Sequence, residues 1–312
     1  MNHALLVSEF LSTPWAVMPD RLTAIAGVVA RWSANIPASP EVMAMVRADA
    51  QAMEARRADA TTRAGGGAIA VLPFYGVCVQ RTSAVDDVSG SGLMSLQRFT
   101  GAFRAALADD SIGAIVIDMD SPGGSVFGVQ ELGNEIYNAR GQKRIVTVAN
   151  SLAASAAYWL GAQSSEFYVT PSGEAGSIGV FAAHSDYSKA LENAGVNTTL
   201  VSAGKYKVEG NPYGPLSDEA RAHMQSRIDT HYGAFTRAVA RGRGTDVATV
   251  RDQMGQGRVF GAADAKTANM VDGVMTLDDV IRQTAKAIGG GGSKGNKSRA
   301  AQMSREISIL NA

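Results

Sequence analysis

The chain has 312 residues, of which 46% are hydrophobic, so it is long enough to fill the core of one sizeable domain. It carries 29 Lys plus Arg and 29 Asp plus Glu, which gives a formal net charge of zero. This balance argues against a strongly basic nucleic-acid-binding protein and against an acidic solvating tail, so function has to be sought in local features.

The cysteine content and the hydropathy pattern bear on the cellular compartment. Cys78 is the single cysteine and stands in the apolar run AIAVLPFYGVCV, so we expect a buried, reduced thiol rather than an internal disulfide. No stretch reaches the roughly 20 apolar residues that span a bilayer, and the first residues lack the pattern of a secretory signal. We therefore expect a soluble, cytoplasmic protein that does not contact a membrane.

Composition divides the chain into three segments. Residues 1–68 are rich in Ala, Met, Glu and Arg and predict a helical extension that ends in the glycine run 65–67. Residues 69–288 alternate between apolar runs and amphipathic segments and form the predicted main domain. Residues 289–312 open as a Gly/Ser linker and close in a short peptide, which is either a flexible tail or a docking or scaffold-like segment.

Strands and helices alternate along the main domain. The predicted strands cover residues 68–79, 112–120, 144–150, 166–171 and 196–202, and the predicted helices cover 95–110, 126–140, 153–163, 184–195 and 217–244, followed by two or three short helices within 248–288. This order predicts an α/β domain with substantial parallel sheet. Ligands of such domains bind near the carboxyl ends of the strands.

The turn DSPGGSV follows one of these apolar strands. Without side chains, Gly123 and Gly124 leave backbone N–H groups free to face an incoming oxygen, as in an oxyanion hole. A Pro-Gly-Gly turn also ends many strands for conformational reasons alone. The turn is therefore a candidate oxyanion hole, and a catalytic residue beside it is needed to support that role.

Ser155 is a candidate for that catalytic residue. It stands at the start of a predicted helix in NSLAASAAYWLG, where flanking alanines would let a substrate backbone approach a nucleophile closely. The alternative is a serine that caps or packs a helix start. SPGG and AASAA each follow an apolar strand about 30 residues apart, so adjacent parallel strands would bring them to one edge of the sheet.

A serine nucleophile needs a base, and the residues leave several candidates. His184 precedes a predicted helix and could complete a Ser-His-Asp arrangement. Lys205 and Lys207 lie in the loop SAGKYKVEGNPYG, and a lysine can act as base when burial lowers its pKa toward neutrality. Glu209 nearby would act against such a shift. His223 and His231 lie in a long polar helix and are expected to be solvated.

Five blocks together carry a resemblance to a known family. IVIDMDSPGGSV, ANSLAASAAYWLG, PSGEAGSIGV, SAGKYKVEGNPYGPLSDEAR and GRVFGAADAKTANMVDGV resemble, in order and spacing, the signal peptide peptidase A family of serine peptidases. The resemblance covers residues 69–285. It implies a ClpP/crotonase-like fold, a superhelix of β-β-α units, here with a helical N-terminal extension and a flexible C-terminal tail.

The resemblance also implies the roles of individual residues. Ser155 would be the nucleophile and Lys207 the general base of a Ser-Lys dyad, with Lys205 and His184 as fallback bases. The backbone N–H groups of Gly124 and Ala156 would form the oxyanion hole, with Gly123 shaping the turn. Family members form ring- or dome-like homo-oligomers in which the lysine reaches the serine across a domain or subunit boundary.

The chain departs from the family pattern in two ways, and other features indicate one branch of the family. The chain shows no membrane anchor, and the family's SGG after the nucleophile is replaced by Ser-Ala-Ala. The soluble form, the helical leader ahead of the main domain and the linker-plus-peptide tail look more like the phage head-maturation (prohead) proteases, which would act in the host cytoplasm or inside the prohead on scaffold, portal and other head proteins. The alternatives are a soluble bacterial signal-peptide-peptidase-like protease, a crotonase-like acyl-CoA enzyme and a catalytically inactive assembly protein.

No cofactor is implied by the sequence. The lone cysteine and the scattered histidines lack the spacing of a zinc site, and no Walker-type phosphate loop is present. The expected partners are other copies of the chain and protein substrates, not nucleic acid.

Overall fold

The computed structural model describes residues 12–19, 26, 69–81 and 93–289 of the chain. Two sheets form its centre, one of seven strands and one of four. The strands are β1 (Trp15–Val17), β2 (Ile69–Tyr75), β3 (Val77–Val79), β4 (Leu93–Ser95), β5 (Ala114–Ser121), β6 (Gly123–Ser125), β7 (Arg144–Ala154), β8 (Glu166–Val169), β9 (Glu174–Gly176), β10 (Val259–Gly261) and β11 (Gly273–Val274). The helices are α4 (Leu96–Ala108), α5 (Val129–Ala139), α6 (Ala156–Gly161), α7 (Ser188–Asn193), α8 (Asp218–Arg243), α9 (Val247–Gln253), α10 (Ala262–Thr267) and α11 (Leu277–Gly289).

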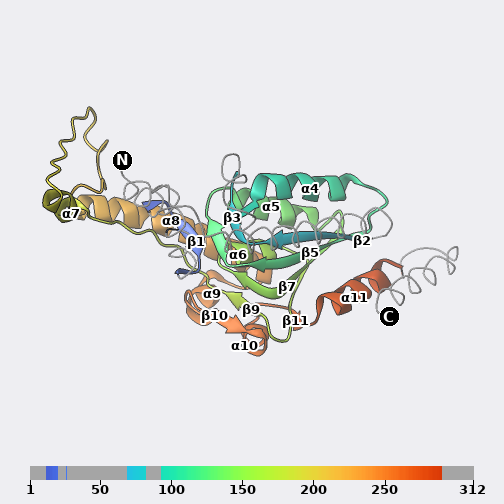
Figure 1. Ribbon diagram of the computed structural model, residues 1–312. Coiled ribbons are helices and arrows are strands. Elements are labelled where there is room, and N and C mark those ends of the chain that lie inside the picture. Colours follow the sequence, from blue (N-terminus) through green and yellow to red (C-terminus); the bar gives the residue numbers. More distant parts are fainter. Residues whose placement is uncertain (1–11, 20–25, 27–68, 82–92, 290–312) are drawn as a thin grey trace, which may run out of the picture.

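The larger sheet is built on three parallel neighbours, β2, β5 and β7. Its strands are buried on both faces, as their continuous apolar sequence requires. Ile115 and Ile117 belong to the main core with helices α4 to α6, whereas Ala114 and Val116 lie in a second cluster against α11. Figure 1 shows α4 and α5 on one side of this sheet and α11 on the other.

The smaller sheet has the strand order β1-β6-β3-β4 and lies at the end of the larger one. After β2 the chain enters β3 of the small sheet and later forms α4; after β5 it enters β6 and then forms α5. Two consecutive β-β-α units therefore place their first strand in the large sheet and their second in the small one. The expected α/β class and its β-β-α construction are confirmed.

Most predicted elements of the main domain occur near the expected residues, but two expectations are wrong. Residues 196–202 were predicted as a strand and instead form an irregular, exposed segment that pairs with none of the described strands, and Val201 is 95% exposed. Trp15–Val17 falls in the predicted helical extension but forms strand β1 of the small sheet. Its backbone pairs with β6 and its side chains are buried, so pairing and packing override the helical composition of its neighbours.

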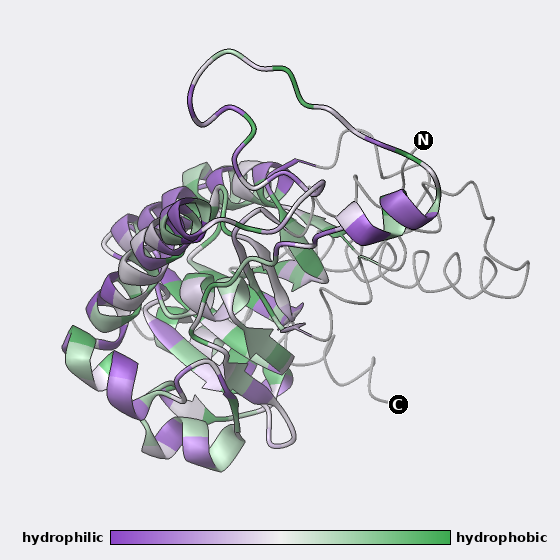
Figure 2. Cartoon of the chain, turned by 90° about the vertical axis from the view of Figure 1, so that its left-hand side faces the viewer, coloured by the Kyte–Doolittle hydropathy of each residue, from purple (hydrophilic) through white to green (hydrophobic). Residues whose placement is uncertain are grey.

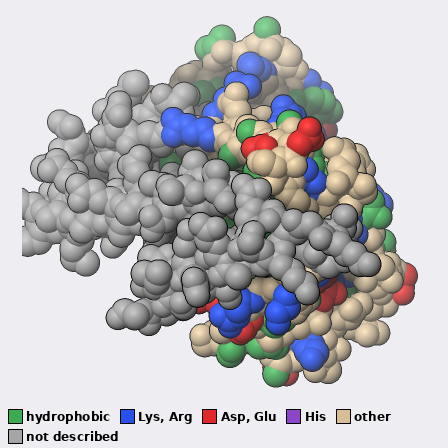
Figure 3. Space-filling model, turned by 90° about the vertical axis from the view of Figure 1, so that its right-hand side faces the viewer, with side chains coloured by type: hydrophobic (Ala, Val, Ile, Leu, Met, Phe, Trp, Pro, Cys, Tyr) green, Lys and Arg blue, Asp and Glu red, His purple; other side chains and the backbone are tan. Residues whose placement is uncertain are grey.

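Residues 1–11, 20–25 and 27–68 of the predicted extension and the tail 290–312 lie outside the described part of the chain. No helix among the described residues is long and apolar enough to cross a membrane. On the face seen in Figure 3, the visible Lys and Arg side chains are interspersed with Asp and Glu side chains, in keeping with the neutral net charge.

Candidate functional site

Ser155 stands between the end of β7 and the start of α6, at the edge where the parallel strands end. Its N–H donates to the Gly176 carbonyl (2.7 Å), and its own carbonyl accepts the first helical bond from the Trp159 N–H (2.9 Å). Its hydroxyl lies 3.5 Å from the Gly179 carbonyl oxygen. The residue is 1% exposed.

The backbone of Ser155 has an unusual conformation, with φ 56° and ψ −118°. A residue with a Cβ adopts such angles only at an energetic cost of about 1–3 kcal/mol, and such residues cluster at active sites. A serine that merely capped α6 would have extended backbone angles and accept a hydrogen bond at its side chain, and Ser155 does neither. The capping alternative is therefore not supported.

The Pro-Gly-Gly turn lies directly beside Ser155. β5 and β7 are parallel neighbours, and Ser121 pairs with Ala153, so the prediction that the two motifs meet at one sheet edge is confirmed. Gly123 has φ 94°, and a Cβ there would come within 2.9 Å of both the Ser155 Cβ and the Ala154 carbonyl oxygen. A Cβ on Gly124 would lie 1.9 Å from the Cys78 carbonyl oxygen. Glycine at 123 therefore lets the turn approach Ser155 closely, and glycine at 124 lets it lie against the backbone of Cys78.

Ala156 is the first residue of α6 and is completely buried. The N–H groups of a first helical turn have no partner within the helix, so they are available to an incoming oxygen. Their position directly after Ser155 matches the expected oxyanion donor. The roles of Gly124 and Ala156 in such a hole remain predictions.

Lys207 lies on a different part of the molecule. Every residue from 192 to 207 is exposed, and the Lys207 N–H is held by the Gly204 carbonyl (3.1 Å) in a turn. The loop after α7 leaves the body of the molecule beyond the end of α8, whereas α6 lies at the centre (Figure 1), and it forms an open arc in Figure 2. Among the hydrogen bonds of the described residues, none joins Lys207 to Ser155.

The two fallback bases are engaged elsewhere. Lys205 donates to the Tyr206 hydroxyl (2.7 Å) and to Glu219 (3.2 Å). These two hydrogen bonds raise the pKa of the Lys205 ammonium, which is the opposite of what a general base requires. His184 places its Nε2 3.0 Å from the Asn211 carbonyl oxygen, within the same loop region.

Polar contacts hold the carboxyl end of α6, the helix that follows Ser155. Arg140 donates to the carbonyls of Gln163 (2.6 Å), Gly242 (3.2 Å) and Ser164. In doing so it ties the chain after α6 to the end of α8. The Tyr158 hydroxyl donates to the Met270 carbonyl (2.9 Å) from within the core.

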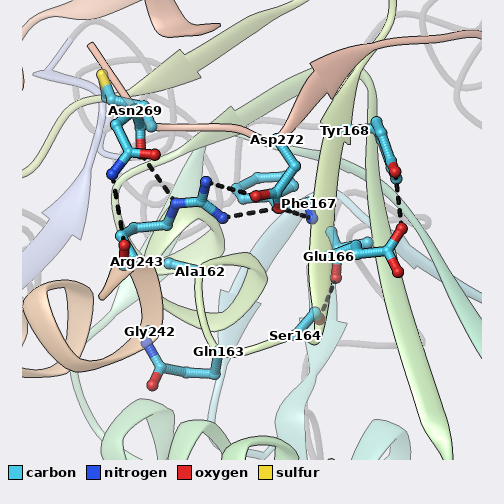
Figure 4. A network of polar contacts seen from close by, with 12 residues as sticks. Ala162, Gln163, Ser164, Glu166, Phe167, Tyr168, Gly242, Arg243, Asn269 and Asp272 are labelled. Atoms are coloured by element: carbon cyan, nitrogen blue, oxygen red, sulfur yellow. Dashed lines mark hydrogen bonds and ion pairs between the residues drawn. The ribbon is translucent and has the colours of Figure 1, made fainter. Parts of the chain in front are cut away.

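An ion pair completes this support (Figure 4). Arg243 makes a two-pronged contact with Asp272, 2.9 Å on each side, and the Phe167 N–H donates to the same carboxylate (2.6 Å). Burial alone would raise the pKa of Asp272, but the contacts with Arg243, the Phe167 N–H and the charge of Arg140 together outweigh it, so the pKa is lowered. Two polar networks thus hold the chain that follows α6.

Cys78 lies beneath the turn, in β3, and pairs with Gly124. It is completely buried, as expected, and burial raises the pKa of its thiol to about 12. This thiol therefore stays protonated near neutral pH and acts as a small packing group. In the described part of the chain, no group of three or more His, Cys, Asp or Glu residues could hold a metal ion.

Sequence reasoning missed the contribution of β1 and of Phe181 to this site. Trp15 exchanges two backbone hydrogen bonds with Phe181 (2.8 and 3.0 Å), and β1 pairs with β6 on its other edge. The signal available was weak: TPWAVMP is a short apolar run between two prolines, inside a segment whose composition otherwise predicts helix.

The chain is similar to a known protein family and to proteins of two phages. The family model described as Peptidase family S49 matches residues 138–289. The chain is 36% identical over 213 residues to the capsid assembly protease C of Escherichia phage lambda, covering 68% of this chain and 48% of that protein. It is 34% identical over 220 residues to the head-tail preconnector protein GP5 of Enterobacteria phage P21, covering 70% of this chain and 43% of that protein. The chain thus spans about half the length of these curated relatives.

Among solved structures, a mutant of the membrane-bound stomatin-specific protease 1510-N is similar to the chain. The TM-score is 0.42 at 13% identity, covering 70% of this chain and 84% of that one.

Proposed function

Because the chain belongs to peptidase family S49, we propose that it is a serine endopeptidase with Ser155 as nucleophile and Lys207 as general base. The observation that carries the proposal is the backbone of Ser155, held at φ 56° beside the close-packed turn of Gly123. This geometry places a hydroxyl at a sheet edge next to the backbone N–H groups of Gly124 and Ala156. Such an arrangement suits acyl transfer.

The reaction would run in two steps. Ser155 Oγ attacks the scissile carbonyl carbon while its proton passes to the Lys207 amine, and the N–H groups of Gly124 and Ala156 stabilise the oxyanion. The C–N bond then breaks, and the leaving amine takes up the proton from Lys207. Water, deprotonated by the same lysine, releases the acyl group from Ser155 and restores the hydroxyl.

The lysine would reach this centre from a neighbouring subunit of a homo-oligomer. Support comes from the position of its loop, which projects away from the body that contains Ser155 and buries none of residues 192–207 within its own protomer. A loop of this kind gains packing only when a second copy receives it. Burial in that contact would also lower the pKa of a lysine toward the range of a base.

The proposed substrates are proteins of an assembling phage head. The support is the similarity to a capsid assembly protease and to a head-tail preconnector protein. Scaffold and portal proteins fit this setting, and the enzyme would act in the host cytoplasm or within the prohead.

The test is covalent labelling combined with proteolysis. A fluorophosphonate should label the wild type but not Ser155→Ala, and co-expression with candidate head proteins should yield fragments only with the wild type. Lys207→Ala should abolish cleavage, because the members of such a unit fail together.

Two controls separate the candidate bases. Lys205→Ala and His184→Ala should retain cleavage within about twofold, since both side chains are engaged within the loop region. If Lys207→Ala cleaves normally and His184→Ala does not, the Ser-Lys assignment fails and a Ser-His mechanism takes its place. If no preparation is labelled at Ser155, the chain is a non-enzymatic assembly protein. The preparations must include the variant with β1 displaced that is described in the next subsection.

A further inference from the structure

Strand β1 lies where a peptide substrate of Ser155 would have to lie. It runs antiparallel to β6, with Ala16 opposite Gly124 and Val17 opposite Gly123. On its other edge, Trp15 bonds to Phe181 in both directions, at 2.8 and 3.0 Å. The segment is thus held between strand β6 and the backbone of Phe181, which resembles the way many proteins bind an extended peptide.

The hydrogen-bond pattern fixes which way each residue of β1 faces. In an extended strand successive residues direct their N–H and C=O groups to opposite edges. The groups of Trp15 face Phe181, so those of Ala16 face β6. The Met18 N–H donates to the Pro122 carbonyl (3.1 Å), which places the next pair of the ladder in the same register. The Ala16 carbonyl therefore faces Gly124, the proposed oxyanion donor.

The same carbonyl lies close to the nucleophile. The Ala16 carbonyl oxygen is 2.3 Å, and the Ser155 Cβ 2.9 Å, from the point that a Cβ on Gly123 would occupy. The oxygen and the serine are therefore neighbours across Gly123. Ser155 is 1% exposed in the structure that contains β1, so a second polypeptide would need a rearrangement to reach its hydroxyl.

The side chains of β1 alternate as those of a bound peptide do. Ala16 belongs to the main core and is completely buried, whereas Trp15 and Val17 form a small separate cluster with Phe181. The space that receives the Ala16 side chain is closed around a methyl group. A residue in this position must be small.

We propose that β1 is an internal pseudosubstrate. It occupies the groove between β6 and residues 179–181 in substrate register, with Ala16 in the position before the scissile bond, and it keeps other polypeptides from Ser155 until it leaves. This inference rests on the proposed function of Ser155, and it adds the regulation of that site and a preference for a small residue before the cleaved bond.

The inhibition is effective because the strand is tethered. A segment on the same chain acts at an effective concentration on the order of millimolar, so free substrates at micromolar concentration compete poorly. The base of the proposed dyad is also absent from the protomer's own site, so β1 is held without being cut. Release of β1 and delivery of Lys207 would both be needed for activity.

The first test compares two substitutions at one position of the full chain. Ala16→Trp cannot enter the closed space, so it should eject β1 and raise kcat/KM for a peptide with alanine before the scissile bond by about tenfold or more. Ala16→Ser keeps a small side chain and should remain within about twofold of the wild type. Val17→Asp, which places a charge in a buried position, should act like Ala16→Trp, and circular dichroism should confirm that all three variants are folded.

The second test uses synthetic peptides against the Ala16→Trp enzyme. A peptide of residues 12–19 should inhibit competitively, and the same peptide with tryptophan in place of Ala16 should not. Equal activity of Ala16→Trp and wild type, or equal effects of both peptides, would overturn the proposal. So would cleavage by the wild type of its own bond between Ala16 and Val17, because β1 would then be a substrate.

A third measurement is independent of catalysis. In a Ser155→Ala background, hydrogen exchange of the amides of β1, β6 and residues 179–181 should accelerate in Ala16→Trp, while β5 and β7 stay protected. If this happens but the Ala16→Trp enzyme that keeps Ser155 is not labelled by a fluorophosphonate, the displacement of β1 is confirmed and the peptidase function fails. If exchange in β1 is unchanged, the pseudosubstrate inference fails whatever the activity.

Discussion

The segment that holds Ser155 and the loop that carries Lys207 are built on opposite principles. Ser155, Gly123 and Ala156 are fixed by strand pairing, tight backbone contacts and a buried helix, whereas residues 192–207 are exposed and bond mainly to their own neighbours. A nucleophile and its oxyanion donors must be placed to within a fraction of an ångström. A base that a neighbouring subunit supplies is absent until the subunits assemble. Because the rigid part carries the nucleophile and the projecting loop carries the base, assembly can control activity.

The largest effect is expected from mixing two inactive variants. If the loop of one subunit serves the serine of another, Ser155→Ala and Lys207→Ala should each be inactive, yet an equal mixture that is allowed to exchange subunits should recover about one quarter of wild-type activity. Half of the subunits keep the serine, and half of their neighbours keep the lysine. Cleavage of a fluorogenic peptide measures the recovery.

The double variant with both substitutions on one chain is the control, since mixing it with Ser155→Ala leaves no intact serine. A mixture of the single variants that stays inactive after exchange would show that serine and lysine must come from the same chain. In that case the loop would have to fold back onto its own protomer.

An intermediate effect, on stability, is expected from breaking the ion pair between Arg243 and Asp272 in the rigid region. Asp272→Asn should lower the free energy of unfolding by about 2 kcal/mol at pH 7, because Arg243 is only 4% exposed and would lose its carboxylate partner. The folded-state pKa of Asp272 is lowered from its ordinary value of 3.8, so its contribution is present above that value. The contribution is lost as pH falls through the folded-state pKa.

Chemical denaturation at pH 7 and at pH 3 measures this difference. The gap between wild type and Asp272→Asn should narrow at the lower pH. A matched substitution at an exposed ion pair, Glu219→Gln, should change stability by less than about 0.5 kcal/mol at either pH, because its partner Lys205 is 70% exposed. If both substitutions lowered the free energy of unfolding equally, the rigid region and the loop would not differ in how much their ion pairs stabilise the fold.

The sequence predicted the rigid half better than the rest, and the reason is physical. Apolar strands, a Pro-Gly-Gly turn and a small-residue helix start are local patterns, and parallel pairing brings their ends together, so the meeting of Gly123 with Ser155 could be anticipated. Residues 196–202 have strand composition but pair with none of the described strands, because composition alone does not determine which segments meet in a sheet. β1 was missed because its partners, β6 and Phe181, lie more than 100 residues away along the chain.

The smallest effect is expected from truncating a valine in the loop. Val201 is 95% exposed, so Val201→Ala should change the free energy of unfolding by less than about 0.5 kcal/mol. The same truncation at Val116, which is completely buried in β5, should cost about 2–3 kcal/mol because it removes two methyl groups from a packed core.

Val201→Ala should nevertheless slow peptide cleavage if its side chain is buried against a second subunit. Thermal unfolding of the dilute protein, where subunits separate, isolates the intrinsic stability, and activity at high concentration reports the contact. A loss of stability at high dilution would mean that the loop packs on its own protomer, and the contrast between a rigid centre and a projecting arm would no longer hold.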